Sequence, residues 1–586
     1  MPVSSINPEH DTVGKFNRLS ASQANTFAEC PRIWWYQNNL RLKFGQTPPL
    51  FLGRAVEECV TRVMMESPGI VTSSAPITVL QNGADNLLPL YDSEISNDIS
   101  QWYASRIAKY WPDICKAMQE EWSKNPRKAG NWHDYSMEEY MQMCITALDL
   151  HLEEVLIVKE SISDEELQKW RNGDDNLLIR SPDRREQLGP HPLARDGPCH
   201  LVEAWEIARP WFVDPDLEPF SQNAIHPEYW FQGEYDLVYR HSSKIKIVDL
   251  KASKGVGDRS GNYVEQLKMY AMLWSKTHNG QIPKELEVWY LGVGKKKSVK
   301  PPTEDQITVL ESQLNQLWNE LKSRTVTISD CPPKPSDLRG FSEGGVPTEA
   351  PEGVRCDSCE WSKLCPSGQG NDNYKIIDNI QPKGEIKSYE LTQLSKLEPR
   401  VNIFCEVFSV TKNSEGIPNV MVQQDGGKAF VKIISKQSEG QLTYEPEIEK
   451  GDFIRLVGVI PSTNWKGEIE LKIDPHARMI KSSSAEDGDC GLFDFKARWN
   501  LYGRVAYKTY KYGIGKSGKP WIRKGIVLID DQTKVTVEGW DNSWPAIYNT
   551  LQQGDEIAIL NASLDAWAVD VKANLEKNTS IIRITD

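Results

Sequence analysis

Two aspartates and a lysine in the middle of this 586-residue chain have the types and spacing that metal-assisted cleavage of a phosphodiester requires. Asp236 ends the run Gly233-Glu-Tyr-Asp, and Asp249 and Lys251 follow in the run Asp-Leu-Lys. Two carboxylates can hold one or two Mg²⁺ ions, which prefer oxygen ligands and keep bound water. The ion lowers the pKa of such a water and stabilises charge on the phosphate. So short a pattern also occurs by chance in surface hairpins, so neighbouring residues must support it.

Cysteines bracket this region and suggest a second kind of centre. Three of them form a C-x2-C-x5-C-P run, and a fourth lies far upstream in the run S-x-S-x7-C-P; the four are Cys30, Cys356, Cys359 and Cys365. Four thiolates can hold either Zn²⁺ or a [4Fe–4S] cluster. Zinc ribbons usually pair two C-x2-C knuckles, and the second knuckle is missing. The missing knuckle counts against a zinc ribbon, and the spacing leaves a cluster, zinc and unrelated thiols open.

The elements that position these carboxylates are predicted to be a hairpin and a helix. Apolar alternation on both sides of His241-Ser-Ser243 predicts two strands, which would place Asp236 and Asp249 near one end of adjacent strands. Lys251 is two residues after Asp249, so both side chains should share one face. The run Gln266-Leu-Lys-Met-Tyr270 should start a helix after the second strand and bring an amide and a phenol to the same mouth. Upstream, we interpret the glutamates of Val202-Glu-Ala-Trp-Glu206 as charges on a strand face.

The order of these motifs closely resembles that of the RecB-like nucleases of the PD-(D/E)XK superfamily, in which G-x-x-D, D/E-x-K and Q-x3-Y follow one another. The resemblance implies an α/β, restriction-endonuclease-like core. It also implies roles for particular residues: Asp236 and Asp249 as catalytic metal ligands, Leu250 as a ligand through its carbonyl, Lys251 as the catalytic lysine, and Gln266 and Tyr270 as residues that position DNA or the site. Mg²⁺ or Mn²⁺ would be the cofactor.

The family's first motif is a helical G-x-x-[VI]-H whose histidine completes the metal site, and this chain departs from it. Gly53-Arg-Ala-Val-Glu57 has a glutamate at that place. Glutamate is a competent Mg²⁺ ligand, so we expect Glu57 to join the site, with either a changed metal preference or a weakened activity.

The cysteine pattern resembles that of the iron–sulfur subgroup of these nucleases, which includes AddB-type and CRISPR-associated members. By this resemblance Cys30, Cys356, Cys359 and Cys365 would hold a [4Fe–4S] cluster. Its expected role is structural, because it would tie the first helix to the end of the nuclease domain.

Three domains are predicted. Residues 1–370 form the nuclease domain, with a large helical insertion at about 70–200, where apolar residues recur at three- and four-residue steps from Tyr140 to Val155. Residues 371–490 and 491–586 each contain short alternating strands and a turn of the form G-D-x-I, at Gly451 and Gly554. These turns favour two small OB-like β-barrels over SH3-like or sandwich domains.

The second barrel has a basic, aromatic stretch that suggests contact with single-stranded DNA. Residues 501–524 contain seven Lys or Arg and no acidic residue, although the whole chain has a net charge of −14. Aromatic faces can stack on unpaired bases while cations follow the phosphates. The candidate residues are Tyr507, Tyr510, Lys511, Tyr512, Trp521 and Lys524. A hairpin with its own aromatic core, or a protein-binding barrel, remains an alternative.

Other features of the sequence narrow the class of function. No run of 18 apolar residues and no secretory leader is visible, so we expect a cytoplasmic protein, cell- or virus-encoded, without a membrane partner. No phosphate loop of a helicase or ATPase is present. We therefore predict a metal-dependent DNA exonuclease acting on single strands or frayed ends in recombination, repair or replication-linked processing. The alternative is a catalytically weak DNA-binding or assembly module, or an accessory subunit of a helicase–nuclease complex. The expected partners are DNA and a helicase or recombination protein.

Overall fold

The computed structural model divides the chain into two compact units, which are described separately. The first consists of the chain up to Asn38 together with Phe44–Cys359, and the second of Asn39–Lys43 together with Glu360–Asp586. The structure describes residues 18–66, 68, 95–172, 194, 196–210, 223–241, 244–253, 260–322, 326–335, 356, 359–368, 370, 377–412, 418–433, 447–464, 466–492, 494–515, 517–530, 532–567, 570–576 and 578–584.

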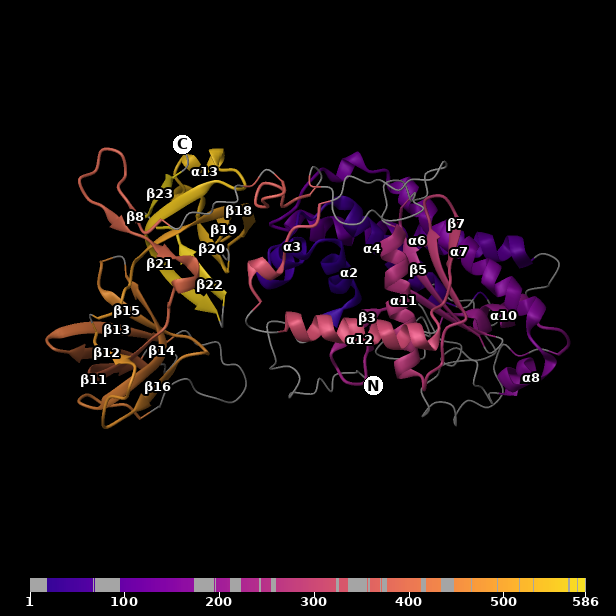
Figure 1. The fold of residues 1–586 in the computed structure, drawn as a ribbon, viewed down its shortest axis with the longest axis horizontal. Helices are drawn as coiled ribbons and strands as arrows, with labels where there is room; N and C mark the ends of the chain where they lie inside the picture. Colours follow the sequence, from indigo (N-terminus) through magenta and orange to yellow (C-terminus); the bar gives the residue numbers. More distant parts are fainter. Residues whose placement is uncertain are drawn as a thin grey trace. The chain divides into compact units, whose positions relative to one another are not determined.

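A four-stranded sheet lies at the centre of the first unit, in the order β4-β5-β6-β7. Its strands are β4 (Leu237–His241), β5 (Lys244–Lys251), β6 (Glu285–Tyr290) and β7 (Lys295–Val299). The pair β5–β6 is parallel and the other two pairs are antiparallel. Helix α11 (Ser260–Thr277) makes the crossover between the parallel strands, as parallel neighbours require. It packs on β5 and β6, with α12 (Glu304–Leu321) beside it (Figure 1).

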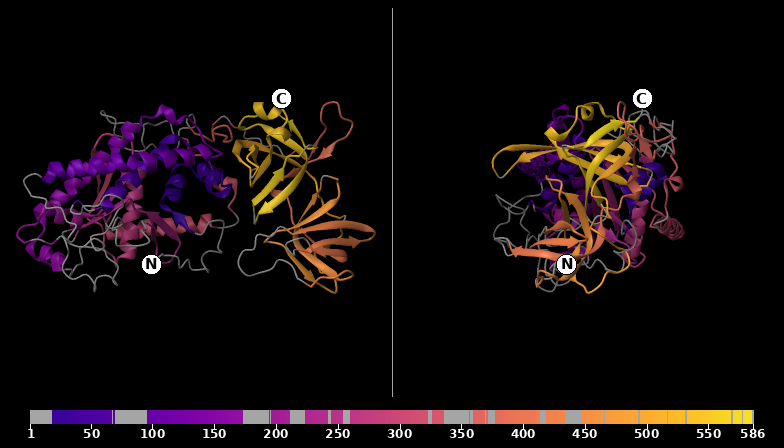
Figure 2. Two further views of the ribbon diagram at one scale, coloured as in Figure 1. Left: turned by 180° about the vertical axis from the view of Figure 1, so that it is seen from behind. Right: turned by 90° about the vertical axis from the view of Figure 1, so that its left-hand side faces the viewer.

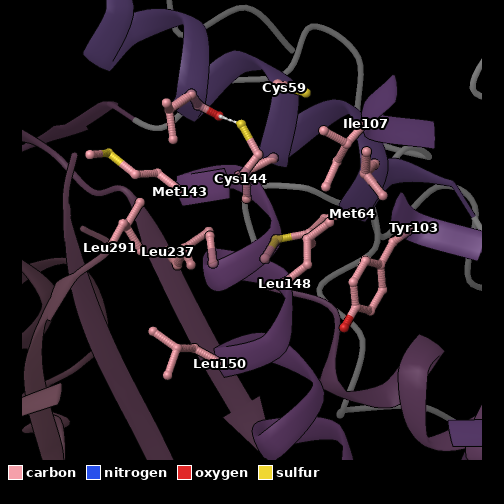
Figure 3. Packing of buried hydrophobic residues seen from close by; sticks show 14 of the residues in the cluster. Cys59, Met64, Tyr103, Ile107, Met143, Cys144, Leu148, Leu150, Leu237 and Leu291 are labelled. Atoms are coloured by element: carbon pink, nitrogen blue, oxygen red, sulfur yellow. Dashed lines mark hydrogen bonds between the residues drawn. The ribbon is translucent and has the colours of Figure 1, made fainter. Parts of the chain in front are cut away.

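Four helices cover the other face of this sheet and form the main core. They are α4 (Pro48–Met65), α6 (Ile95–Lys124), α7 (Met137–Ser161) and α10 (Leu201–Ala208). Their buried side chains pack on Leu237 of β4 and on Leu291, which follows β6. Figure 3 shows this packing, with Cys144 of α7 directed at the carbonyl of Val56 on α4. The core therefore fixes α4, which carries Glu57, against the helices and strands around it.

A smaller sheet adds to the first unit the segments that flank the motifs. It has the order β1-β3-β2, from β1 (Leu19–Ser20), β3 (Phe231–Glu234) and β2 (Asn223–Ile225). Ser20 pairs with Gln232 and also caps helix α2 (Ala21–Glu29), accepting the backbone N–H of Gln23 in a capping box. Further helices described in this unit are α3 (Pro31–Trp34), the π-helical turn Trp35–Asn39, α8 (Asp164–Asn172) and the 3-10 helices Trp132–Asp134 and Ile328–Asp330.

Three predictions about local structure need correction. The Val202-Glu-Ala-Trp-Glu206 run is not a strand but lies in α10, a helix whose eight residues are all buried. The segment from Gly233 does not form one arm of a single hairpin, because β3 and β4 belong to different sheets. Gln266 does not start a helix, since α11 begins at Ser260. The turn at 242–243, and much of the expected helical insertion and of the loop at 172–200, lie outside the described residues.

Figure 2 shows the two barrels of the second unit. Each has five strands, with the same connectivity in both. In each, the first strand pairs with the second and fourth, and the third pairs in parallel with the fifth; this is the OB-fold strand order. The first barrel is β11 (Val401–Lys412), β12 (Pro418–Gln424), β13 (Gly427–Ile433), β14 (Phe453–Thr463) and β15 (Ile469–Ile473). The second is β18 (Trp499–Ile514), β19 (Pro520–Ile529), β20 (Lys534–Trp540), β21 (Glu556–Trp567) and β22 (Asp570–Asn574).

Short elements complete the barrels: β10 (Thr392–Gln393), β16 (Arg478–Lys481), β17 (Asp489–Cys490), α13 (Ile547–Thr550) and β23 (Ser580–Arg583), with the separate pair β8 (Asn379–Ile380) and β9 (Tyr389–Glu390). Arg400 joins the two barrels, since its guanidinium donates to the Gly458 carbonyl and the Asp474 carboxylate of the first and to the Ala566 carbonyl of the second. Among the described residues, no helix is long and apolar enough to cross a membrane.

Candidate active site

The β4–β5 pairing brings the two motif aspartates to the same end of the sheet. Leu237 pairs with Val248, so Asp236, just before β4, lies beside the end of β5. The backbone N–H of Leu250 donates to Asp236 Oδ2 at 2.6 Å. One residue earlier on β5, Asp249 is fully buried, with none of its surface exposed. The hairpin geometry therefore sets the positions of both carboxylates through backbone contacts.

Lys251 lies on the same face of β5 as Asp249, and the two side chains form an ion pair. Lys251 Nζ is 2.7 Å from Asp249 Oδ2, and one fifth of the lysine side chain is exposed. The ammonium thus offsets the charge of a buried carboxylate, which would otherwise be very costly to ionise, while remaining accessible from solvent.

A cavity of about 800 Å³ opens beside these residues within the first unit. Asp236 and Glu57 both line it, although Glu57 comes from α4, some 180 residues away in the sequence. Gln266 and Tyr270 line it from α11, and the side-chain amide of Gln266 donates to the Tyr270 hydroxyl at 2.5 Å. The structure therefore brings the motifs Gly53–Glu57, Gly233–Asp236 and Gln266–Tyr270 to one cavity.

The carboxylates in this region raise one another's pKa values. Burial raises the pKa of Asp236 well above its usual value, and the nearby charge of Asp249 raises it further, whereas Lys251 lowers it. Burial also raises the pKa of Glu57, and the charges of Glu234 and Asp249 raise it further. Burial likewise raises the pKa of Tyr270, so this phenol stays protonated. Such a cluster of acidic groups is stabilised when a cation binds among them.

The donor set fits a hard divalent cation. Three carboxylates, from α4, from the start of β4 and from β5, supply the oxygen ligands that Mg²⁺ and Mn²⁺ accept. Within the described ranges, no three acidic, histidine or cysteine side chains are as close together as the ligands of one ion. The carboxylates would therefore have to move closer together to share an ion. Leu250 has a described contact through its backbone N–H, which donates to Asp236. The role of its carbonyl as a metal ligand stays a prediction.

Several cavity residues were not anticipated from sequence. Ser20, Ser22 and Gln232 line one wall of the cavity, where β1 pairs with β3. Arg54 lines the cavity from α4, one turn before Glu57. The S-x-S run was noticed only as part of the cysteine pattern, and its proximity to the carboxylates depends on a strand pairing between distant segments. Glu234, two residues before Asp236, also lines the cavity and adds another acidic group.

The four motif cysteines all lie among the described residues, and none of them is in a disulfide bond. Cys30 is buried after α2, and its Sγ accepts the backbone N–H of Lys334 at 3.4 Å. Cys356 and Cys359 share one turn, in which the N–H of Cys359 donates to the carbonyl of Cys356. The N–H···S contact and the shared turn suit thiolate ligands. Cys365, in the second unit, is held in its turn by the carbonyl of Trp361.

The candidate nucleic-acid residues of the second barrel do not share one face. Directly paired residues of an antiparallel sheet project from the same side, and their neighbours from the other. Tyr510 pairs with Lys524, so they and Tyr512 lie on one face of the β18–β19 hairpin. Lys511 pairs with Arg523 and belongs to the opposite face. Tyr507 was predicted to contact DNA, but its side chain is buried and its hydroxyl accepts the backbone N–H of Lys43. Its ring is therefore not exposed for stacking on a base.

The face that carries Lys511 forms an aromatic and basic surface, which we name the Trp platform: Lys511, Trp521, Arg523 and Trp540. Lys511, Arg523 and Trp540 are paired in one row across β18, β19 and β20. The Trp521 ring lies on Gly513, where a Cβ would come within 2.6 Å of it. Trp540 is 55% exposed and meets Trp521 edge-on. The platform therefore presents two indoles beside two cations.

Solved structures with similar parts include several with OB domains. One is a replication protein A heterotrimer bound to single-stranded DNA, with 12% identity over 33% of this chain and 51% of that chain, and a TM-score of 0.14. Another is DNA-binding domain A of S. cerevisiae replication protein A, with 17% identity over 16% of this chain and 90% of that one, and a TM-score of 0.14. This chain thus spans about half the length of the first. The assignment of the barrels rests on their own strand order.

The search of curated proteins found no match. The family model of the PD-(D/E)XK nuclease superfamily matches residues 18–366, which is more than half of the chain and takes in all the motif residues of the first unit. The chain therefore belongs to the PD-(D/E)XK nuclease superfamily.

Proposed function

We propose that this protein is a RecB-like DNA nuclease that uses Mg²⁺ or Mn²⁺ to hydrolyse phosphodiester bonds. The observation that carries the proposal is that Glu57 and Asp236 line one cavity and are coupled electrostatically to the Asp249–Lys251 ion pair. Charge accumulates on the phosphate oxygens during this reaction, and preorganised cations are its usual source of stabilisation. Four residues of the cavity region can supply that stabilisation, three by holding a metal ion and one directly.

Each residue of the site has a distinct task in this proposal. Glu57, Asp236 and Asp249 would hold the divalent ion, which supplies an activated water and a counter-charge to the phosphate. Lys251 would hold the attacking water and offset phosphate charge, since its ammonium is anchored at Asp249 yet partly exposed. The Gln266 amide and the protonated Tyr270 phenol would position the strand at the cavity mouth.

The proposed substrate is single-stranded DNA or a frayed DNA end, cleaved as an exonuclease. Stacking of an unpaired base on an exposed indole is worth about 1–3 kcal/mol, and the Trp platform offers two indoles with Lys511 and Arg523 beside them. Because the barrels and the nuclease unit belong to one chain, the platform would bind the same strand that the nuclease unit cleaves. The expected pathways are recombination, repair or replication-linked processing, with a helicase as the partner that opens duplex.

A [4Fe–4S] cluster on Cys30, Cys356, Cys359 and Cys365 belongs to the same proposal. The N–H donated to Cys30 Sγ and the hydrogen bond from the N–H of Cys359 to the carbonyl of Cys356 support it. Iron and sulfide analysis of anaerobically purified protein tests it, together with the visible absorbance of such clusters. Cys356→Ser should lose the iron; a protein that is iron-free as isolated and stable would contradict this part without affecting the nuclease proposal.

The nuclease proposal is tested with end-labelled linear and circular single-stranded DNA, and with linear duplex, each with Mg²⁺, Mn²⁺ or EDTA. We expect metal-dependent degradation of the linear single strand and protection of the circle. Asp249→Ala combined with Lys251→Ala should abolish cleavage and retain DNA binding. Cleavage of the circle would show an endonuclease, and cleavage that persists in the double variant would place the catalytic site elsewhere.

A second function is favoured by one observation, the glutamate at position 57. If the additional negative charge weakens catalysis, the first unit would act as a DNA-binding or assembly module, or as an accessory subunit of a helicase–nuclease complex. Wild-type protein that binds single strands in every metal condition but leaves them intact would support this alternative. Restoration of cleavage by Glu57→His would then identify Glu57 as the cause.

A further inference from the structure

An aromatic ring on α11 faces the lysine of the site, and no sequence motif includes it. The ammonium of Lys251 lies 4.7 Å from the centroid of the Tyr263 ring and 2.7 Å from Asp249 Oδ2. Tyr263 is half-buried, three residues before Gln266 on the helix that follows β5. The ammonium thus has two described contacts, one with a carboxylate and one with an aromatic ring.

The distance falls within the range over which an aromatic ring attracts a cation. An ammonium within about 6 Å of a ring centroid is held by the negative face of the ring, and the attraction grows as water is excluded. A lysine side chain has four rotatable bonds and a compact charge that water solvates strongly, so a single ion pair leaves it considerable freedom. A second contact restricts that freedom at the place where the charge is needed.

We propose that Tyr263 is a positioning residue that holds the Lys251 ammonium at the reacting phosphate. This inference rests on the proposed nuclease function, and it concerns the ring of Tyr263 rather than its hydroxyl. The ring holds the ammonium from one side while Asp249 holds it from another, and one fifth of the lysine side chain stays exposed. Catalysis depends on such placement, because a charge that is already oriented costs no reorganisation when the phosphate charge develops.

Substitutions at position 263 separate the ring from the hydroxyl. Tyr263→Phe keeps the ring and should retain the wild-type single-turnover cleavage rate within about twofold. Tyr263→Leu keeps an apolar side chain without a ring and should slow that rate about 5- to 30-fold, the factor that corresponds to a partly desolvated cation–π contact. Because the DNA contacts remain, the dissociation constant for single-stranded DNA in Ca²⁺ should not change.

A matched control lies in the second unit. Lys387 is 5.5 Å from the ring centroid of Tyr389, a lysine–tyrosine pair of the same kind. Tyr389→Leu removes this pair and should leave the cleavage rate unchanged. A rate loss in both leucine variants would indicate a general effect of losing an aromatic residue and would overturn the inference.

The dependence on Lys251 is tested by a double-mutant cycle with Lys251→Ala. If Tyr263 acts through the lysine, Tyr263→Leu should slow the residual cleavage of Lys251→Ala by less than twofold. An equal loss in both backgrounds, or an equal loss in the Phe and Leu variants, would overturn the inference, the second by assigning the effect to the hydroxyl.

A measurement without cleavage separates this inference from the proposed function. Reductive ¹³C-methylation labels the lysine ammonium groups, and Lys251→Arg identifies the resonance of Lys251. The ring current of Tyr263 should shift this resonance upfield in the wild type and in Tyr263→Phe, but not in Tyr263→Leu. An inactive wild type that shows the shift would refute the nuclease function and retain the positioning contact; an active wild type without the shift would refute the contact alone.

Discussion

The glycine of the G-x-x-D motif, Gly233, should be intolerant of even a single added methyl group. It lies in β3 under α11, and a Cβ at this position would be 2.8 Å from Leu273 Cδ1 and 2.9 Å from Tyr270 Cε1. Carbon atoms in ordinary contact are about 3.5 Å or more apart, so α11 or its side chains must move by about 0.6 Å. Tyr270 is one of the residues that line the cavity.

The cost of Gly233→Ala can be bounded from this geometry. Inserting a methyl group into a well-packed region typically costs about 1–3 kcal/mol, and both contacting side chains are buried. The displacement also moves the Tyr270 ring and, through its hydroxyl, the Gln266 amide. A misplacement near 1 Å at a site can reduce the rate by about 100-fold, so we expect roughly a 10-fold loss for about half that movement.

The glycine of the first motif provides a matched control. Gly53 lies inside α4, and a Cβ there would meet only the Cβ of Ala252 at 3.8 Å, an ordinary contact. Because glycine is unfavourable inside helices, Gly53→Ala should stabilise the protein by about 0.5–1 kcal/mol. Two glycines from neighbouring motifs are thus expected to respond to the same substitution with opposite sign.

Denaturant unfolding and single-turnover cleavage measure both effects. In the Leu273→Ala background one of the two clashes is absent, so Gly233→Ala should cost measurably less there than in the wild type. The reasoning fails if Gly233→Ala unfolds and cleaves like the wild type, or if its cost is the same in both backgrounds.

Three further predictions follow from other parts of the structure. Burial lowers the pKa of His151 from 6.5 to about 3. As the pH falls, the unfolded chain therefore takes up the proton before the folded chain does, and the free energy of unfolding should fall by about 2–3 kcal/mol between pH 6.5 and 4.5. His151→Phe should remove this pH dependence in denaturant titrations. Trp540→Ala should weaken single-stranded DNA binding about 10- to 100-fold by fluorescence anisotropy, whereas Tyr510→Ala, on the opposite face, should not. Glu57→His should raise the ratio of Mn²⁺- to Mg²⁺-supported cleavage, because imidazole suits manganese better than magnesium; an unchanged ratio would show that residue 57 is not a ligand.

Part of the site could be predicted because its geometry is local. Asp236 and Asp249 are brought together by the pairing of β4 with β5, and a short turn leaves little choice of register. Period-two alternation is enough to place Asp249 and Lys251 on one face, where they form their ion pair. The superfamily followed from the order of the motifs and is confirmed by the match over residues 18–366.

The errors arose where burial or long-range packing removes the local signal. All eight residues of α10 are buried, so this helix lacks the polar face that distinguishes a helix from a strand in sequence. Tyr507 follows a register shift between Val505 and Tyr507, and residues 39–43, more than 460 positions earlier, supply its hydrogen-bond partner. The role of Tyr263 could not be predicted from sequence, because its contact with Lys251 depends on how α11 packs on the sheet.

Glu57 changes the charge of the site. A histidine at this place would be neutral or positive, whereas the glutamate adds a third carboxylate beside Asp236 and Asp249, and its pKa is raised by burial and then by its acidic neighbours. Ionising all three together is therefore unfavourable until a cation arrives. Lys251 pairs with Asp249 and its charge also lowers the pKa values of Glu57 and Asp236, so one cation faces three carboxylates. Metal binding and deprotonation must accordingly be coupled, so the divalent ion would bind more tightly as the pH rises.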